Sequence, residues 1–336
     1  MITPSTRRSN EEVLSRPRGS LRRWLHARGV VPGFSLPTED VRLRTRDGVE
    51  LAATYLAGPR QRSAPAVVLL HGFGGHRTKP AYALLAERLS TVAAVLAIDL
   101  RGHGASGGFS TLGLAETLDV TAAAAWLRRR GYEWVGLVGV SMGATAALRA
   151  AGVAPPGAYD AVCSVSAVAR WGLRDTPAMR HLTKAVTIAA YRQFYRAVLG
   201  VRIAARGWPD TSPHADTRQW PVQPVDAVGR IAPTPLLLVH GIDDHYFGPE
   251  QAKTLYDHAN EPVQLWLEPH GFGHAEDGFT RAFCDRLAAA VVAVHHTGLW
   301  PGSGQIGAAA LQLEEQLVEG GRVQLLAVAQ QGQTEG

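Results

Sequence analysis

Short hydrophobic runs recur along this chain, and most of them end in glycine or polar residues. A continuous run of this kind is typical of a strand buried on both faces of a parallel sheet. Between these runs, hydrophobic residues recur at helical spacing. The alternation predicts an α/β fold, with a mostly parallel central sheet and helices on both faces. The expected strands cover 65–70, 92–100, 133–140, 159–168, 234–241 and 263–269, and the expected helices 79–89, 114–131, 142–152, 248–259 and 279–294.

Two segments depart from this alternation. Residues 40–56 read as a β-hairpin, because two strand-like runs flank Asp47-Gly48, a strong turn signal. Residues 170–230 hold a helical pattern over 180–205 and then irregular, proline-rich sequence, without a buried-strand pattern. A plain connection of ~60 residues is unusual inside a domain. We interpret this stretch as an inserted helical cap, placed over the carboxyl ends of the strands, where folds of this class bind ligands.

The patterns divide the chain into four parts. Residues 41–169 and 231–297 are expected to form the α/β core, with 170–230 as the helical cap. Residues 1–40 are a basic leader, and 298–336 are a tail to which the pattern assigns no structure.

Positive charge is concentrated in the leader. The first 30 residues hold seven arginines against two glutamates, a surplus that equals the net charge of +5 for the whole chain. The rest of the chain is formally neutral, which argues against nucleic acid as a partner. The leader is expected to be a solvated arm, and the alternative is that "SLRRWLHARGVV" contacts an anionic membrane surface.

The sequence also bears on location. It has no apolar run of the ~18 residues that a membrane span needs, and no apolar segment of a secretion signal near its start. Its two cysteines, Cys163 and Cys284, lie far apart and do not indicate a disulfide framework. These features favour a cytoplasmic location.

A candidate nucleophile lies in "GVSMG", Gly139 to Gly143, between a buried strand and a helix. Gly-x-Ser-x-Gly at such a junction is typical of a nucleophile elbow, a sharp turn that exposes a strained serine at a helix N-terminus. Ser141 would be that serine. A serine hydroxyl needs a base to activate it, and the base needs an acid to orient it.

Candidates for the acid and the base follow later strands. Asp243 and Asp244 come after the strand 234–241, and His270 and His274 come after the strand 263–269. Carboxyl ends of parallel strands meet at one edge of a sheet, so these side chains can converge on Ser141. The residues alone leave both pairs open. The order along the chain is serine, aspartate, histidine, which is the order of the α/β-hydrolases.

On these motifs, together with "HGFGG" and "DLRGHGAS", residues 41–295 apart from the cap resemble the α/β-hydrolase superfamily, close to its capped serine esterases and peptidases. The resemblance implies Asp244 as the acid, four residues after a His-Gly histidine, and His274 as the base, after Gly-x-Gly. Asp243 and His270 remain the reserves. It also implies an oxyanion hole formed by the backbone N–H groups of Phe73 and Met142. His103, Asp99 and Asp119 are expected to be structural.

The expected chemistry is hydrolysis of an acyl bond through an acyl-enzyme, with a small-molecule carboxylic ester as the favoured substrate. An aminopeptidase, amidase or thioesterase using the same residues, or a non-catalytic receptor, are the alternatives. An aminopeptidase would need cap carboxylates to bind an amine, and the cap has Asp175, Asp210, Asp216 and Asp226. No cofactor is expected. No metal is expected either, because the glycines of "HGFGH" break the helix on which zinc-binding histidine pairs lie.

Overall fold

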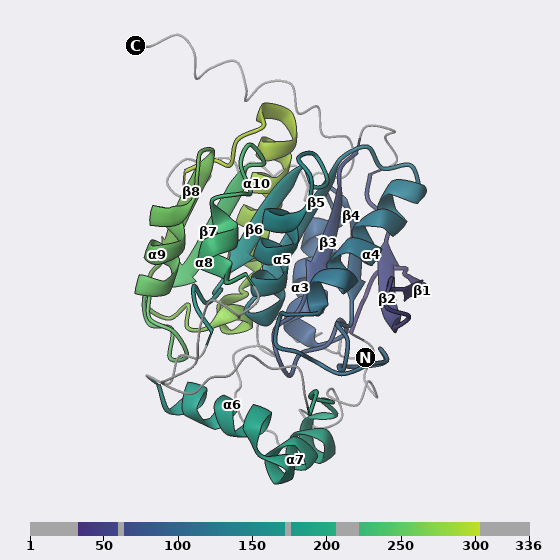
Figure 1. The fold of residues 1–336 in the computed structure, drawn as a ribbon. Coiled ribbons are helices and arrows are strands. Elements are labelled where there is room, and N and C mark those ends of the chain that lie inside the picture. The colour runs from purple at the N-terminus through teal and green to yellow at the C-terminus, as the bar shows by residue number, and fades with distance from the viewer. Residues whose placement is uncertain (1–32, 60–63, 172–175, 206–221, 303–336) are drawn as a thin grey trace, which may run out of the picture.

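The computed structural model describes residues 33–59, 64–171, 176–205 and 222–302 (Figure 1). In these residues eight strands form one sheet in the order β1-β2-β4-β3-β5-β6-β7-β8. β1 and β2 pair antiparallel, β2 pairs antiparallel with β4, and every pair from β4 to β8 is parallel. The strands are β1 (Glu39–Arg44), β2 (Glu50–Leu56), β3 (Ala66–Leu70), β4 (Ala94–Ile98), β5 (Val135–Val140), β6 (Ala161–Val165), β7 (Leu236–Gly241) and β8 (Val263–Glu268).

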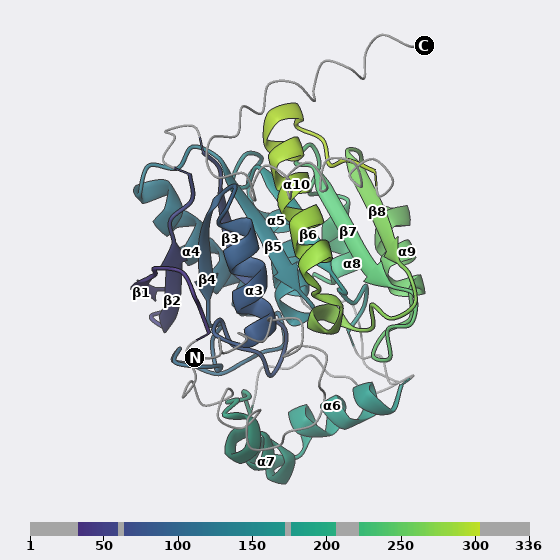
Figure 2. The ribbon, with the colours of Figure 1, turned by 180° about the vertical axis from the view of Figure 1, so that it is seen from behind.

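Helices cover both faces of this sheet. One face carries α3 (Pro80–Leu89) and α10 (Arg281–Thr297), which contact each other and stand in front in Figure 2. The opposite face, in front in Figure 1, carries α4 (Glu116–Arg129), α5 (Met142–Val153), α8 (Pro224–Val228) and α9 (Glu250–His258). The predicted α/β fold is confirmed, with its mostly parallel sheet.

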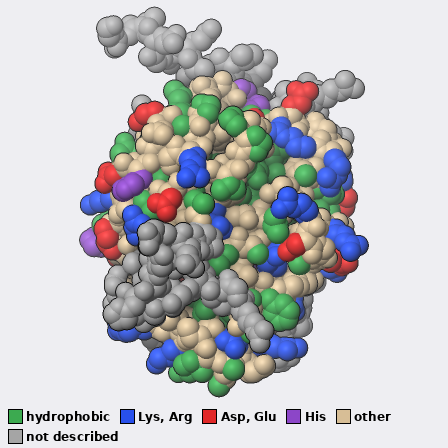
Figure 3. All heavy atoms as spheres, in the orientation of Figure 1, with side chains coloured by type: hydrophobic (Ala, Val, Ile, Leu, Met, Phe, Trp, Pro, Cys, Tyr) green, Lys and Arg blue, Asp and Glu red, His purple; other side chains and the backbone are tan. Residues whose placement is uncertain are grey.

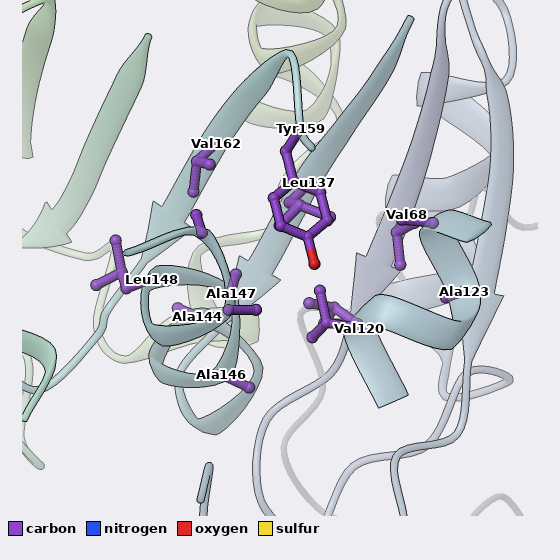
Figure 4. Packing of buried hydrophobic residues seen from close by; sticks show 14 of the residues in the cluster. Val68, Val120, Ala123, Leu137, Ala144, Ala146, Ala147, Leu148, Tyr159 and Val162 are labelled. Atoms are coloured by element: carbon purple, nitrogen blue, oxygen red, sulfur yellow. The ribbon is translucent and has the colours of Figure 1, made fainter. Parts of the chain in front are cut away.

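The core has two layers, one on each side of the sheet. Every residue of β3, β4 and β5 is buried, whereas β1 at the sheet edge buries only alternate residues. Figure 4 shows how one layer packs, with Val68 and Leu137 of neighbouring strands facing Val120 of α4 and Ala147 of α5. Burial on both faces explains why the central strands read as unbroken hydrophobic runs.

Helices α6 (Pro177–Thr187) and α7 (Ala189–Leu199) lie apart from the two layers, at the edge where the parallel strands end (Figure 1). The sequence pattern predicted one helical stretch here, and the structure divides it at Ile188, whose backbone is extended with φ −107° and ψ 122°. Ile188 ends a run of three β-branched residues from Val186, which disfavours helix. Gly200 ends α7 in the left-handed conformation, with φ 71°.

The end of the predicted cap packs with the core. Helix α8 lies within residues 170–230, yet it contacts α5, and Val225 and Val228 belong to the core. A Cβ on Gly152 of α5 would lie 2.3 Å from the Ala227 carbonyl oxygen, so the two helices are in close contact. Residues from about 224 therefore pack as core rather than cap. Residues 172–175 and 206–221 of the predicted cap lie outside the described residues.

Both predicted ends of the core extend slightly further than expected. β1 begins at Glu39, within the range given to the leader. Trp300, in the range given to the tail, is buried, and its Nε1 donates to the carbonyl of Pro235 at 3.0 Å. The leader and tail otherwise fall on residues 1–32 and 303–336, outside the described residues. Of the helices described, none combines the length and hydrophobicity that crossing a membrane requires.

Candidate active site

Ser141 lies at the junction between β5 and α5, in a backbone conformation rarely adopted by residues other than glycine. Its φ is 51° and its ψ is −112°. Strain of this kind costs about 1–3 kcal/mol and clusters at functional sites. The flanking glycines are required by close backbone contacts, because a Cβ on Gly139 would lie 2.5 Å from the Gly143 oxygen, and one on Gly143 would lie 2.5 Å from the Leu70 oxygen. The turn is therefore tight enough to present the serine side chain at the sheet edge.

Three of the predicted side chains converge at this edge. His274 Nε2 lies 3.0 Å from Ser141 Oγ, and His274 Nδ1 lies 2.7 Å from Asp244 Oδ2. Ser141 follows β5, Asp244 follows β7 and His274 follows β8, so strand ends at the same edge of the sheet supply all three, with β6 between β5 and β7. The carboxylate side chain of Asp244 is fully buried, while the imidazole is 11% exposed.

The charge of Asp244 determines which nitrogen of His274 carries a proton. Burial raises the pKa of Asp244, but the hydrogen bond and charge of His274, and the Phe247 N–H, outweigh burial and leave that pKa below its ordinary value. The carboxylate is thus ionised and can only accept hydrogen bonds. Nδ1 of His274 must then be the donor, which leaves the lone pair of Nε2 free to accept the Ser141 proton.

The loop after β7 fixes the Asp244 carboxylate. Its Oδ1 accepts hydrogen bonds from the N–H groups of Tyr246 at 2.8 Å and Phe247 at 3.0 Å. A second histidine, His240, places its Nε2 3.4 Å from Asp244 Oδ2 and 3.1 Å from the Phe247 oxygen. Burial lowers the pKa of His240, so it is neutral beside the acid. In the sequence, His240 only marks the position of Asp244, and no local signal indicates its contact with the acid.

The two reserve residues have other surroundings. Asp243 accepts hydrogen bonds from the N–H groups of Gly271 at 2.6 Å and Gly273 at 3.0 Å, and these bonds lower its pKa. It therefore shapes the loop that leads to His274. His270 is exposed. The structure brings Asp244 and His274 to Ser141, and neither Asp243 nor His270.

The backbone N–H groups of Phe73 and Met142 are the predicted oxyanion donors. Met142 is the first residue of α5, before the first intrahelical bond, which Thr145 donates to the Ser141 oxygen. The loop after β3 approaches the serine, since a Cβ on Gly72 would lie 3.2 Å from Ser141 Cβ. The Gly72 oxygen accepts from His71 Nδ1 at 2.7 Å and Gly75 N at 3.0 Å. The Phe73 N–H belongs to the same trans peptide and points the opposite way, so its direction is fixed.

Two other histidines are buried, His71 within this loop and His103 packed against Phe73, and neither contacts Ser141. His71 Nε2 accepts the Leu100 N–H at 3.0 Å, and His103 Nδ1 lies 3.1 Å from the Arg101 oxygen. Burial lowers the pKa of each to about 3. The two rings lie 5.1 Å apart between centroids. His103 is thus packed as a structural residue would be.

The burial of these two neutral histidines predicts that the protein loses stability in weak acid. Below the unfolded value of about 6.5 the unfolded chain binds protons that buried His71 and His103 do not, so the free energy of unfolding falls as the pH falls. The slope is roughly 1 kcal/mol per pH unit for each histidine between pH 6.5 and 5. Urea unfolding measured across this range on the wild type and on His103→Gln isolates the contribution of one histidine, because the variant should lose that histidine's share of the slope. An unchanged slope in the variant would contradict the assignment.

Helices α6 and α7 contact the loops that surround Ser141. The Phe73 and Tyr195 rings lie 5.6 Å apart, and a Cβ on Gly74 would lie 3.6 Å from Leu199 Cδ1. The Thr176 hydroxyl donates to the carbonyl of Tyr246, whose ring lies 4.5 Å from the His274 ring.

The end of the molecule that carries α6 and α7 has both Lys or Arg side chains, blue in Figure 3, and hydrophobic side chains, green in Figure 3. Residues 177–199 contain four basic side chains and no Asp or Glu: Arg180, Lys184, Arg192 and Arg196.

Comparison with known proteins identifies what the chain resembles. Residues 65–197 match the family described as alpha/beta hydrolase fold. The Pyrococcus furiosus esterase Pf2001 is similar at 22% identity and a TM-score of 0.56, covering 76% of this chain and 91% of its own. The esterase domain of a Rhodothermus marinus protein is similar at 21% identity and a TM-score of 0.53, covering 77% of this chain and 99% of its own. A hypothetical protein from Pseudomonas aeruginosa is similar at 21% identity and a TM-score of 0.54, covering 76% of this chain and 94% of its own. A search of curated proteins found no match.

Proposed function

We propose that this chain, which has the α/β-hydrolase fold and whose residues 65–197 match the alpha/beta hydrolase fold family, is a serine hydrolase that cleaves a carboxylic ester through an acyl-enzyme. The observation that carries this proposal is the continuous hydrogen-bonded series from Asp244 through His274 to Ser141. The Gly-x-Ser-x-Gly turn supports it, because strain at Ser141 is otherwise an unexplained cost.

In the first half of the reaction, Ser141 Oγ attacks the ester carbonyl carbon while His274 Nε2 takes the hydroxyl proton. Asp244 stabilises the imidazolium that forms. The Phe73 and Met142 N–H groups would bind the oxyanion of the tetrahedral intermediate, and one such donor contributes about 3 kcal/mol to transition-state binding. The intermediate then expels the alcohol, which leaves with the proton held on His274.

In the second half, water attacks the acyl-enzyme. His274 Nε2 takes a proton from the water, the second tetrahedral intermediate forms against the same N–H groups, and the bond to Ser141 Oγ breaks. The proton on His274 returns to Ser141. The products are a carboxylic acid and the resting enzyme.

The composition of α6 and α7 favours an ester over a peptide. Neither helix contains a carboxylate that could bind the amine of an aminopeptidase substrate. Asp226 lies on α8, which packs against α5, and the other three aspartates of the predicted cap lie outside the described residues. Phe73, Tyr195 and Tyr246 provide apolar surface near the serine, which suits an acyl group.

The two buried, unpaired cysteines support a cytoplasmic location.

The substrate class can be tested with a panel of chromogenic substrates. p-Nitrophenyl esters of graded acyl length are expected to turn over, with aminoacyl-p-nitroanilides much slower. Acyl-CoA thioesters belong in the same panel. Efficient anilide cleavage with negligible ester turnover would replace the esterase proposal with a peptidase. A folded protein that neither hydrolyses any substrate nor reacts with a fluorophosphonate probe would instead indicate a receptor.

A further inference from the structure

A hydrogen-bonded connection joins the loop after β3 to the loop after β8. Tyr82 of α3 is fully buried. Its hydroxyl oxygen accepts the Gly72 N–H at 2.8 Å, and the hydroxyl donates to Glu276 Oε2 at 2.7 Å. The other carboxylate oxygen of Glu276 pairs with Lys79 Nζ. Glu276 lies two residues after His274, so a single tyrosine spans the loops that carry a predicted oxyanion donor and the base.

The direction of this connection is fixed by its charges. A backbone N–H can only donate, so the Tyr82 oxygen is the acceptor for Gly72, and its hydrogen must point to Glu276. Burial raises the pKa of Tyr82, which keeps the hydroxyl protonated. Burial also raises the pKa of Glu276, but the charge and hydrogen bond of Lys79 and the bond from Tyr82 leave it lowered, so the carboxylate is ionised. A charged acceptor makes the tyrosine bond stronger than a neutral one would be.

At Gly72 the connection completes a clamp on the backbone. The N–H is held by Tyr82, and the C=O is held by His71 and Gly75. The peptide that carries the Gly72 C=O also carries the Phe73 N–H. With the bonds on both sides of Gly72 occupied, the direction of the Phe73 N–H is set by Tyr82 and His71 together.

At the other end, the clamp acts on the residues next to the base. Ala275 follows His274 with a strained φ of 54°, and its N–H donates to the Ser166 hydroxyl at 3.1 Å. Glu276 is the next residue and is tied to α3 through Tyr82 and Lys79. Ser166 and Glu276 therefore hold the strained turn from two sides, and movement of Glu276 would carry His274 with it.

We propose that Tyr82 and Glu276 are positioning residues that keep the Phe73 N–H and the His274 imidazole in a fixed relation above Ser141. This inference rests on the proposed hydrolase function. Neither residue touches the serine. They act by coupling two loops that the sequence separates by almost 200 residues. A misplacement of about 1 Å in such a site can cost 100-fold in rate.

Kinetics of Tyr82→Phe, Glu276→Gln and the double variant test the coupling on the p-nitrophenyl ester turned over best by the wild type. Tyr82→Phe should lower kcat about 10- to 100-fold with KM changed less than about twofold, because the loss falls on the transition state. Glu276→Gln keeps the shape but loses the charge. If the two residues act as one unit, the double variant should be no slower than Tyr82→Phe alone.

A second readout separates positioning from general support of the fold. The Ser141 hydroxyl adds to the carbonyl of a trifluoromethyl ketone inhibitor. The adduct carries its oxyanion where the tetrahedral intermediate of the ester reaction would carry its own. Its inhibition constant should rise in Tyr82→Phe by the same factor by which kcat/KM falls. The matched control is Tyr159→Phe, which removes another buried hydroxyl, 3.5 Å from the Thr121 hydroxyl and away from the loops around Ser141. It should leave both constants unchanged.

Several results would overturn the proposal. Wild-type kinetics in Tyr82→Phe, or a double variant whose loss is the product of the two single losses, would show that the residues are not coupled through the site. Equal losses in Tyr82→Phe and Tyr159→Phe would reduce Tyr82 to a structural role. A wild-type protein without ester turnover or fluorophosphonate labelling would overturn the hydrolase function and this inference together, whereas an active wild type with an unaffected Tyr82→Phe would overturn this inference alone.

Discussion

Replacing Ser141 with alanine is expected to lower kcat at least about 10,000-fold, because the nucleophile and the whole acyl-enzyme route are lost. The substitution removes one oxygen and keeps a Cβ, so the strained backbone at φ 51° is the same in both proteins. We therefore expect the thermal midpoint to stay within a few degrees of the wild type. Initial rates with excess ester, together with fluorophosphonate labelling, measure the effect.

The chain offers a close control for this experiment. Ser164 lies in β6, the strand next to β5, and its buried hydroxyl has no hydrogen-bond partner among the described residues. Ser164→Ala should keep both labelling and turnover. If Ser141→Ala retained more than about one hundredth of the wild-type kcat while remaining folded, the serine would not be the nucleophile, and the acyl-enzyme mechanism would have to be abandoned.

Replacing Asp244 with asparagine is expected to lower kcat about 1,000- to 10,000-fold. In the wild type, Asp244 Oδ2 is an acceptor 2.7 Å from His274 Nδ1. In the variant, the amide would present an N–H group at that position. The imidazole would then carry its proton on Nε2, facing Ser141, and could no longer take the serine proton. The loss should appear in kcat at saturating ester, with little change in KM.

Asp243→Asn is the matched control, since it makes the same change one residue earlier. Asp243 bonds the backbone of Gly271 and Gly273 rather than the imidazole, and an asparagine oxygen can still accept one of those bonds. We expect a loss of no more than about tenfold, from a less firmly held loop. Comparable losses in both variants would mean that Asp244 has no special role, and a larger loss in Asp243→Asn would make Asp243 the acid.

The fold was accessible from the sequence because its signals are local. Strands buried on both faces read as unbroken runs such as "PAVVLL", and the Gly-x-Ser-x-Gly turn marks its own junction between strand and helix. The break at Ile188 was missed because helical spacing continues on both sides of it. The packing of α8 on α5 was missed because "PVDAV" is only five residues long and follows irregular sequence.

The candidate site was also only partly predictable from local sequence signals. From its own residues the sequence determined Ser141 as the candidate nucleophile and the strand ends that carry candidate acids and bases. It could not by itself choose Asp244 over Asp243 or His274 over His270, because neighbours in a loop share every local signal. That choice, and the Tyr82–Glu276 connection, depend on directions of side chains and on contacts between segments far apart in the chain. Only the packed tertiary structure decides these, since burial and hydrogen-bond geometry arise when the strand ends are brought together.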